Sequence, residues 1–157
     1  MSESISLRPV TAEEDEFLYA LYASTRMDEV AAFGWNEVQA EAFLRMQFGL
    51  RQQAYRMQFP GADDTVILLN GKPVGRLIIE RRDHEMVITD IAILPQYRKK
   101  GIGSQLIHEL KSEVSGSAKP LVLRVDKSNI AAKAFYEKAG FAVIGDTDIV
   151  WAMECRP

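Results

Sequence analysis

The spacing of apolar residues predicts a chain that begins mainly with helices and continues mainly with strands. Apolar side chains recur every three or four positions over 17–22 and again over 40–48, as on one face of a helix. From Thr65 onward, short apolar runs bounded by turn residues predict strands, and the pair Asn70-Gly71 predicts a hairpin turn. We expect strands at 5–7, 66–69, 74–80, 86–94, 121–125, 141–144 and 149–153, and helices after Thr11 and over 36–57, 102–114 and 130–139.

The order of these elements predicts an α/β (α+β) fold. The succession of strand, helix and strand over 86–125 implies a parallel pair joined by a crossover, whereas strands joined by short turns pair antiparallel. We therefore expect a mixed, mostly antiparallel central sheet of about seven strands with about four helices. A length of 157 residues suits one domain, so residues 1–157 are expected to form a single domain.

The composition argues against several classes of function. The net charge of −3 does not fit a general nucleic-acid binder, for which a basic domain is expected. No apolar run approaches the roughly 18 residues of a membrane span, and residues 1–4 do not resemble a signal peptide. With one cysteine, Cys155, and two histidines, neither an internal disulfide nor a structural zinc site is expected. We expect a cytoplasmic protein that binds no metal, no membrane and no nucleic acid.

The stretch from Arg98 to Ser104, which reads Arg-Lys-Lys-Gly-Ile-Gly-Ser, carries the first candidate chemistry. It lies between a predicted strand and a predicted helix. Backbone N–H groups at the start of a helix are unpaired, and the helix dipole adds partial positive charge, so such a turn attracts anions. Gly101 and Gly103 lack the Cβ atoms that would hold a phosphate away from the backbone. With three cations beside it, the turn predicts a site for a pyrophosphate.

The same turn has other interpretations. Two glycines at a strand–helix junction also fit a solvated basic turn that caps an ordinary helix. A Walker A motif is excluded, because no Gly-Lys-Ser/Thr sequence follows the glycines. A dinucleotide fingerprint would need a third glycine where Leu106 stands, although Asp126 could take the place of its ribose-binding acid. A nicotinamide-dinucleotide-binding domain therefore stays open as an alternative.

A second informative stretch covers residues 129–141. Asn129 can cap a helix that Gly140 ends, and Ala132 and Tyr136 share one face of that helix by their spacing. Taken alone, these residues fit a capping asparagine and a half-buried helix aromatic better than they fit a site.

The two stretches together resemble the GNAT superfamily of acyl-CoA-dependent N-acyltransferases. The resemblance lies in Arg98-x-x-Gly101-x-Gly103 after a strand and in Asn129-x-x-Ala132-x-x-Phe135-Tyr136 further along the chain. The order of elements is also similar to that family's over nearly the whole chain. The resemblance implies a GNAT-like fold whose sheet splays between the fourth and fifth strands. It also implies transfer of an acetyl group from acetyl-CoA (coenzyme A) to a primary amine, by direct attack in a ternary complex.

The resemblance further implies roles for single residues. The backbone of Ile91, Ala92 and Ile93 would run alongside the pantetheine arm and the acyl carbonyl, and Asn129 would hydrogen-bond that arm. Tyr136 would stand near the sulfur as general acid, since a tyrosine of pKa about 10 can protonate a departing thiolate of pKa about 8.5. The implied cofactor-binding residues are Ile91, Ala92, Ile93, Arg98, Lys99, Lys100, Gly101, Ile102, Gly103, Ser104, Asn129, Ala132 and Tyr136.

Three carboxylates are candidates for the base that takes the proton of the attacking amine. Where many relatives in the superfamily carry an acid, this chain has Val87. Asp90 is preferred, because a charged residue inside an otherwise apolar strand needs an explanation. Glu85 and Glu80 are the alternatives, and all three also fit solvated carboxylates of a sheet.

The acceptor is expected beside the first two helices, so that residues 27–43 would set specificity. Acidic residues outnumber cations there: Asp28, Glu29, Glu37 and Glu41. Together with Phe33 and Trp35, this composition predicts an acidic, aromatic-lined pocket for a cationic amine, with Glu29, Phe33 and Trp35 as substrate-binding residues. The acids also fit plain surface charges at helix ends.

Several alternatives stay open at this level. The sequence does not distinguish a small-molecule amine from a peptide amine, or a monomer from a homodimer. A non-catalytic acyl-CoA-binding module would keep the same phosphate-binding turn without transferring an acyl group.

Overall fold

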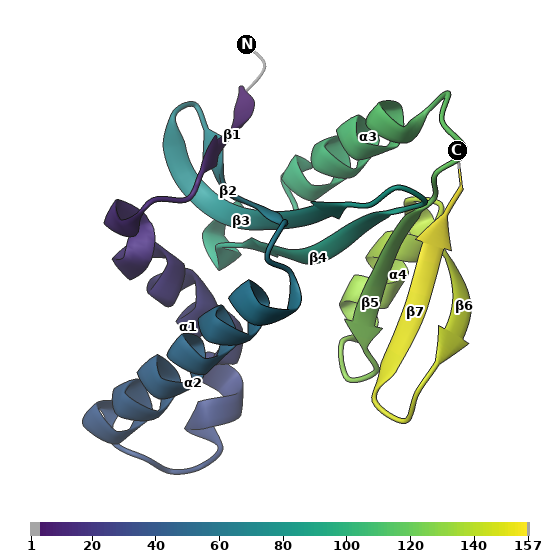
Figure 1. Cartoon of the computed structure of the whole chain (residues 1–157). Helices are drawn as coiled ribbons and strands as arrows, with labels where there is room; N and C mark the ends of the chain where they lie inside the picture. Colours follow the sequence, from purple (N-terminus) through teal and green to yellow (C-terminus); the bar gives the residue numbers. More distant parts are fainter. Residues whose placement is uncertain (1–3, 157) are drawn as a thin grey trace. The chain divides into compact units, whose positions relative to one another are not determined.

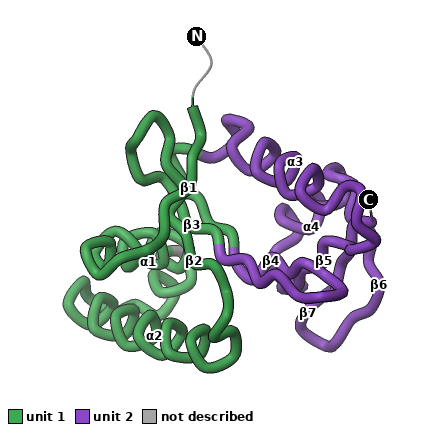
Figure 2. The backbone as a smooth tube through the Cα atoms, turned by 45° about the horizontal axis from the view of Figure 1, so that its top comes forward, with its two compact units in different colours: residues 1–77, 91–97 green, residues 78–90, 98–157 purple. Residues whose placement is uncertain are grey.

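The structure divides into two compact units. Two strands in the middle of the chain, β3 (Lys72–Arg81) and β4 (Met86–Ile93), each have residues in both units. The computed structural model describes residues 4–156 (Figure 1). Its first unit is Met1–Leu77 with Ile91–Tyr97, and its second is Ile78–Asp90 with Arg98–Pro157, as Figure 2 shows.

The strands form one mixed sheet in the order β1-β2-β3-β4-β5-β7-β6. The remaining strands are β1 (Ile5–Pro9), β2 (Asp63–Leu69), β5 (Leu121–Asp126), β6 (Ala142–Asp146) and β7 (Val150–Cys155). β1 pairs antiparallel with β2, and β7 pairs antiparallel with both β5 and β6, whereas β4 pairs parallel with β5. The predicted seven-stranded, mixed and mostly antiparallel sheet is confirmed.

The hairpin turn between β2 and β3 has the predicted chemistry. Asn70 and Gly71 have φ angles of 52° and 83°. Two successive left-handed residues match the right-handed twist of the flanking strands, and asparagine followed by glycine adopts this geometry at low cost.

The helices of the structure are η1 (Ala12–Glu14), α1 (Asp15–Ala31), α2 (Glu37–Gln58), η2 (Pro95–Tyr97), α3 (Ile102–Val114) and α4 (Ile130–Lys138), η1 and η2 being short 3₁₀ helices. In the first unit, capping boxes start η1 and α2. The Thr11 backbone N–H donates to Oε2 of Glu14 at 2.7 Å, and Oδ1 of Asn36 accepts from the Gln39 N–H at 2.8 Å. Among residues 4–156, no helix is both long and apolar enough to cross a bilayer.

The second unit has its own apolar core, which fixes the start of α3. The apolar face of α3 and the inward-facing residues of β5 and β7 are almost completely buried: Ile102, Leu106, Ile107, Leu110, Val114, Leu121, Leu123, Val125 and Met153. Burying such a side chain contributes roughly 1.5–3 kcal/mol, so the position of α3 is strongly determined. The turn that precedes α3 is thereby held in place.

Candidate functional site

The turn before α3 contains two residues with left-handed backbone. Lys99 has a φ of 61°, and Gly101, the N-cap of α3, has a φ of 84°. Glycine adopts this conformation without the cost that a Cβ brings. The Ile102 side chain, which follows at once, is 2% exposed and anchors the start of the helix in the core.

The backbone N–H groups at the start of α3 make this turn a candidate anion site. The first helical hydrogen bond runs from the Gln105 N–H to the Gly101 carbonyl at 3.0 Å, so the preceding N–H groups have no acceptor within the helix. A Cβ added at Gly101 would meet no atom within 4 Å, which leaves the space over the turn open. The side chains of Arg98, Lys99 and Lys100 are exposed beside it. The turn therefore fits a multiply charged anion such as a diphosphate.

Strand β4 extends beyond its pairing with β5. Within the described residues, the register between the two strands covers Met86 to Ile88 opposite Leu121 to Leu123, although β4 continues to Ile93. Parallel pairing that stops after so short a register agrees with the splay predicted between the fourth and fifth strands.

In the first unit, the end of β4 is held closely against β3. The Leu94 N–H donates to the Val74 carbonyl at 2.9 Å. A Cβ added at Gly75 would collide with the Ala92 carbonyl oxygen and would lie 3.3 Å from the Cα of Ile93. Ile91, Ala92 and Ile93 are half-buried. The backbone expected to line the cofactor is thus fixed by a glycine on the neighbouring strand.

Asn129 caps α4, as the sequence predicts. Its Oδ1 accepts from the Ala132 N–H at 3.1 Å, and its own N–H donates to the Asp126 carbonyl at 2.9 Å. Because the cap occupies Oδ1, the side-chain NH₂ is the group that Asn129 can present to a ligand.

Tyr136 lies buried on α4, in the second unit. Its ring packs against Phe135 and Phe141, with ring centroids 5.2 and 5.6 Å away, and the residue is 8% exposed. In the described part of the chain its hydroxyl has no hydrogen-bond partner. Burial, and then the negative charge of Asp90, raise the pKa of Tyr136 well above its usual value. The hydroxyl therefore keeps its proton at neutral and mildly alkaline pH.

The three carboxylates proposed as bases lie in different environments. The charge of Asp90 acts on Tyr136. Glu80 accepts from Nε of Arg82 at 2.8 Å, while its other oxygen is buried without a partner among residues 4–156. Glu85 lies 3.8 Å from Nη1 of the same arginine. The described residues contain no group of three His, Cys, Asp or Glu side chains that could hold a metal ion.

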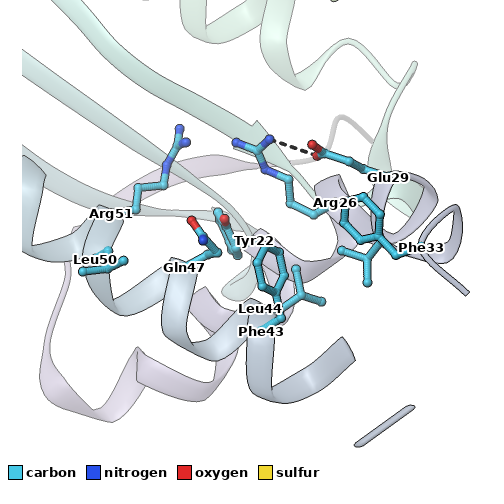
Figure 3. Close-up of a pocket in the computed structure, with 10 residues that line it drawn as sticks. Tyr22, Arg26, Glu29, Phe33, Phe43, Leu44, Gln47, Leu50 and Arg51 are labelled. Atoms are coloured by element: carbon cyan, nitrogen blue, oxygen red, sulfur yellow. Dashed lines mark hydrogen bonds and ion pairs between the residues drawn. The ribbon is translucent and has the colours of Figure 1, made fainter. Parts of the chain in front are cut away.

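The first unit contains a cavity of about 370 Å³ between α1 and α2 (Figure 3). It is lined from α1 by Tyr22, Arg26, Glu29 and Val30, from the turn after α1 by Phe33, and from α2 by Phe43, Leu44, Gln47, Leu50 and Arg51. Glu29 and Phe33 of the predicted substrate residues line it. Trp35 does not, and packs instead against Phe33 and Phe43 with both ring centroids 5.0 Å away.

The expectation of an acidic pocket is wrong for this cavity, since two arginines and one glutamate line it. Glu37 lies in the first turn of α2, and Glu41 pairs with Nε of Arg45 at 3.0 Å, so both are helix-surface charges. The side chain of Asp28 lies outside the described residues. The net charge of the acidic stretch was therefore a poor guide to the charge of the cavity.

Sequence reasoning missed Tyr22, Arg26, Gln47 and Arg51. The signal that could have found them is helical spacing. Tyr22 and Arg26 are four residues apart on α1, as are Gln47 and Arg51 on α2, so each pair projects from one face of its helix.

Comparison with known proteins gives one family match and several similar solved structures. The acetyltransferase (GNAT) family pattern matches residues 26–141. Among solved structures, the PaiA N-acetyltransferase of Thermoplasma acidophilum, in complex with coenzyme A, is 19% identical with a TM-score of 0.70 over 98% of this chain and 99% of its own. An acetyltransferase of Thermus thermophilus is 20% identical with a TM-score of 0.69, over 98% and 97%. Ard1 of Thermoplasma volcanium is 20% identical with a TM-score of 0.62, over 97% of both chains. A search of curated proteins found no match.

Proposed function

Because the chain belongs to the acetyltransferase (GNAT) family, we propose that it transfers an acetyl group from acetyl-CoA to a primary amine of a small molecule or peptide. In this proposal residues 1–157 act as one cytoplasmic catalytic domain. The observation that carries it is the turn before α3, where the left-handed Gly101 leaves open space beside the first N–H groups of the helix, which have no acceptor within the helix. A similar structure, the PaiA N-acetyltransferase, is a complex with coenzyme A.

The chain offers groups for each part of the cofactor. The N–H groups of the turn, with Arg98, Lys99 and Lys100 beside them, would hold the pyrophosphate. The NH₂ of Asn129 and the backbone of Ile91 to Ile93 would hold the pantetheine arm. Acetyl-CoA, when bound, supplies an acyl group activated as a thioester.

Two groups of the second unit would move the protons. Tyr136 would give its hydroxyl proton to the departing sulfur as the C–S bond breaks, and the second proton that the nitrogen loses on becoming an amide would restore the tyrosine hydroxyl, directly or through solvent. Asp90 would accept the proton that the ammonium of the acceptor must lose before the nitrogen can attack, with Glu80 and Glu85 as alternative bases. A backbone N–H at the end of β4 would stabilise the developing oxyanion, an interaction of a kind worth a few kcal/mol.

Thiol release tests the proposal. The purified protein is incubated with acetyl-CoA and a panel of primary amines, and free coenzyme A is measured with a thiol reagent against a control without protein. Amine-dependent thiol release supports the proposal. Acetyl-CoA binding without thiol release for any amine would instead indicate a non-catalytic acyl-CoA-binding module.

A further inference from the structure

The cavity of the first unit has a polar side and an apolar side. In Figure 3 the guanidinium groups of Arg26 and Arg51 lie on one side of the cavity, and Phe43 and Leu44 lie on the other. Its volume of about 370 Å³ falls in the range of sites for small molecules. We propose that this cavity binds the acceptor, and that the acceptor is an amine carrying an anionic group, a carboxylate or a phosphate, next to an apolar portion. This inference rests on the proposed function.

Both arginines lie close to the same aromatic ring. The guanidinium carbon of Arg26 lies 5.5 Å from the centroid of the Tyr22 ring, and that of Arg51 lies 5.9 Å from the same centroid. Arg51 also lies 5.2 Å from the Tyr55 ring centroid. Stacking on an aromatic face restricts a guanidinium, so less freedom is lost when it binds a ligand. Two positioned guanidinium groups on one cavity form a site for an anion.

The ion pair of Arg26 with Glu29 does not remove this capacity. Nη1 of Arg26 donates to Oε2 of Glu29 at 3.2 Å, and a guanidinium has five N–H donors arranged to meet carboxylates and phosphates in pairs. Glu29 is 61% exposed, so this pair is weak. Two of the three charged side chains that line the cavity are arginines with several N–H donors each, which favours an acceptor with an anionic group over a polycation.

The opposite side of the cavity suits an apolar portion of the same molecule. Leu44 is 6% exposed and Val30 is 5% exposed, so the floor of the cavity is part of the core of this unit. Phe33 and Phe43 add aromatic surface, their ring centroids being 6.3 Å apart. An amine with an aromatic or aliphatic side chain would bury apolar surface there while its anionic group meets the arginines.

Three probes with one carbon skeleton test the inference. They are L-phenylalanine, its phosphonate analogue 1-amino-2-phenylethylphosphonate, and phenethylamine, which lacks the anionic group. Affinities are measured by titration calorimetry with coenzyme A present, so that no transfer occurs. We expect one or both anionic probes to bind about tenfold or more tightly than phenethylamine, because hydrogen bonds to charged groups are strong. The carboxylate and phosphonate arms then show which anion is preferred.

Substitutions locate the effect. Arg26→Gln and Arg51→Gln should each reduce the preference for the anionic probe about fivefold or more. Arg56→Gln removes the same charge from an exposed position of α2 that does not line the cavity, so it should leave the preference within about twofold. Circular dichroism confirms that each variant is folded. The comparison of the three probes on the unmodified protein tests the inference independently of the variants.

The outcomes separate this inference from the proposed function. Equal binding of the three probes, no binding of any of them, or a preference that survives both cavity substitutions would overturn the inference. Thiol release with amines that lack an anionic group, together with equal binding of the probes, would leave the acetyltransferase proposal intact and overturn only the inference about the acceptor. A preference lost in Arg26→Gln and Arg51→Gln but kept in Arg56→Gln supports it.

Discussion

The Tyr136 hydroxyl is the single group whose chemistry depends most on its surroundings. Burial and the Asp90 carboxylate raise its pKa, and within the described residues the hydroxyl donates to no other group. Tyr136→Phe keeps the ring and its packing and removes only the proton donor. We expect kcat to fall about 10²-fold, near the lower end for general acid catalysis, because a thiolate is already a fair leaving group. The KM for acetyl-CoA should change little, which steady-state kinetics would show.

A control for this prediction is Tyr19→Phe. Tyr19 packs against Phe48 with ring centroids 5.9 Å apart, and it belongs to the first unit. Losing its hydroxyl should leave kcat within about twofold, as is usual for a conservative change outside the site. If Tyr136→Phe also left kcat unchanged, the leaving sulfur would be protonated by another donor.

Glu14 shows how a local cap makes stability depend on pH. Its carboxylate accepts from the Thr11 hydroxyl at 2.6 Å and from the Thr11 N–H at 2.7 Å, and it pairs with Arg8 at 2.6 Å. These contacts, those of Thr11 first, lower the pKa of Glu14 below its usual 4.5. A carboxylate with a lowered folded-state pKa stabilises the fold above its unfolded-state pKa, and this stabilisation is lost as the pH falls through the folded-state value.

Glu14→Gln should therefore lower Tm at pH 7 and have a smaller effect at pH 3, because the stabilisation by the carboxylate is lost as the pH falls toward and through its folded-state pKa. Thermal unfolding followed by circular dichroism at the two pH values measures this. Glu13→Gln, a change at the exposed neighbouring position, should shift Tm little at either pH. A loss from Glu14→Gln that is equal at pH 7 and pH 3 would show that packing, and not charge, explains the effect.

At the scale of elements, the proposal assigns coenzyme A binding to the backbone of the turn before α3. Gly101 has a φ of 84° at the N-cap of α3. Gly101→Val would place a β-branched side chain in a strained backbone and over the open N–H groups, so the affinity for coenzyme A should fall severely. Lys99→Ala should cost far less, because one exposed charge contributes about 1 kcal/mol or less. Calorimetric titration with coenzyme A compares them. A larger loss from Lys99→Ala would show that the basic side chains are the binding element.

The contact of β3 with the end of β4 makes a different prediction. A Cβ at Gly75 would collide with the Ala92 carbonyl oxygen, whereas a Cβ at Gly49 in α2 would meet nothing within 4 Å. Gly75→Ala should destabilise the protein by about 1–3 kcal/mol, a usual cost of overpacking. Gly49→Ala should stabilise it by about 0.5–1 kcal/mol, because alanine loses less backbone entropy in a helix. Urea unfolding of both variants measures the difference, and equal effects would contradict the close approach of the two strands.

An element could be predicted from the sequence where the residues that determine it are neighbours in the chain. The start of α2 could be predicted, because the capping box of Asn36 and Gln39 uses residues three positions apart. The hairpin at Asn70-Gly71 was equally local. The close approach at Gly75 was not predictable, because the Ala92 carbonyl that it accommodates lies on another strand.

The candidate site likewise has parts that the sequence predicts and a part that it does not. The turn at Gly101 could be found from neighbouring residues, and Asn129 could be recognised as a cap. The cavity could not, because its charge depends on which faces of α1 and α2 meet. Arg26 and Arg51 come together from positions 25 residues apart, while nearby Glu41 is paired with Arg45 on the helix surface.

At the scale of the whole molecule, the two units share β3 and β4, so neither contains all of the sheet. Both strands continue without a break from the residues of one unit into those of the other. We therefore expect the chain to unfold as one cooperative system, in which a ligand of the native state stabilises the whole. Acetyl-CoA at 100 times its Kd should increase the free energy of unfolding by about 2.7 kcal/mol, the value that mass action requires for one site.

The specificity of this stabilisation decides between the proposed cofactor and the nicotinamide alternative. In the proposal the turn at Gly101 binds a pyrophosphate through its backbone N–H groups, and NADH also carries a pyrophosphate. Leu106 occupies the position where a dinucleotide fingerprint has its third glycine, which would allow close packing of the helix on the strand. We therefore expect acetyl-CoA to raise the midpoint of urea unfolding in a single transition, and NADH at the same concentration to leave it unchanged. Equal stabilisation by both ligands, or stabilisation by NADH alone, would refute acetyl-CoA as the cofactor of this chain.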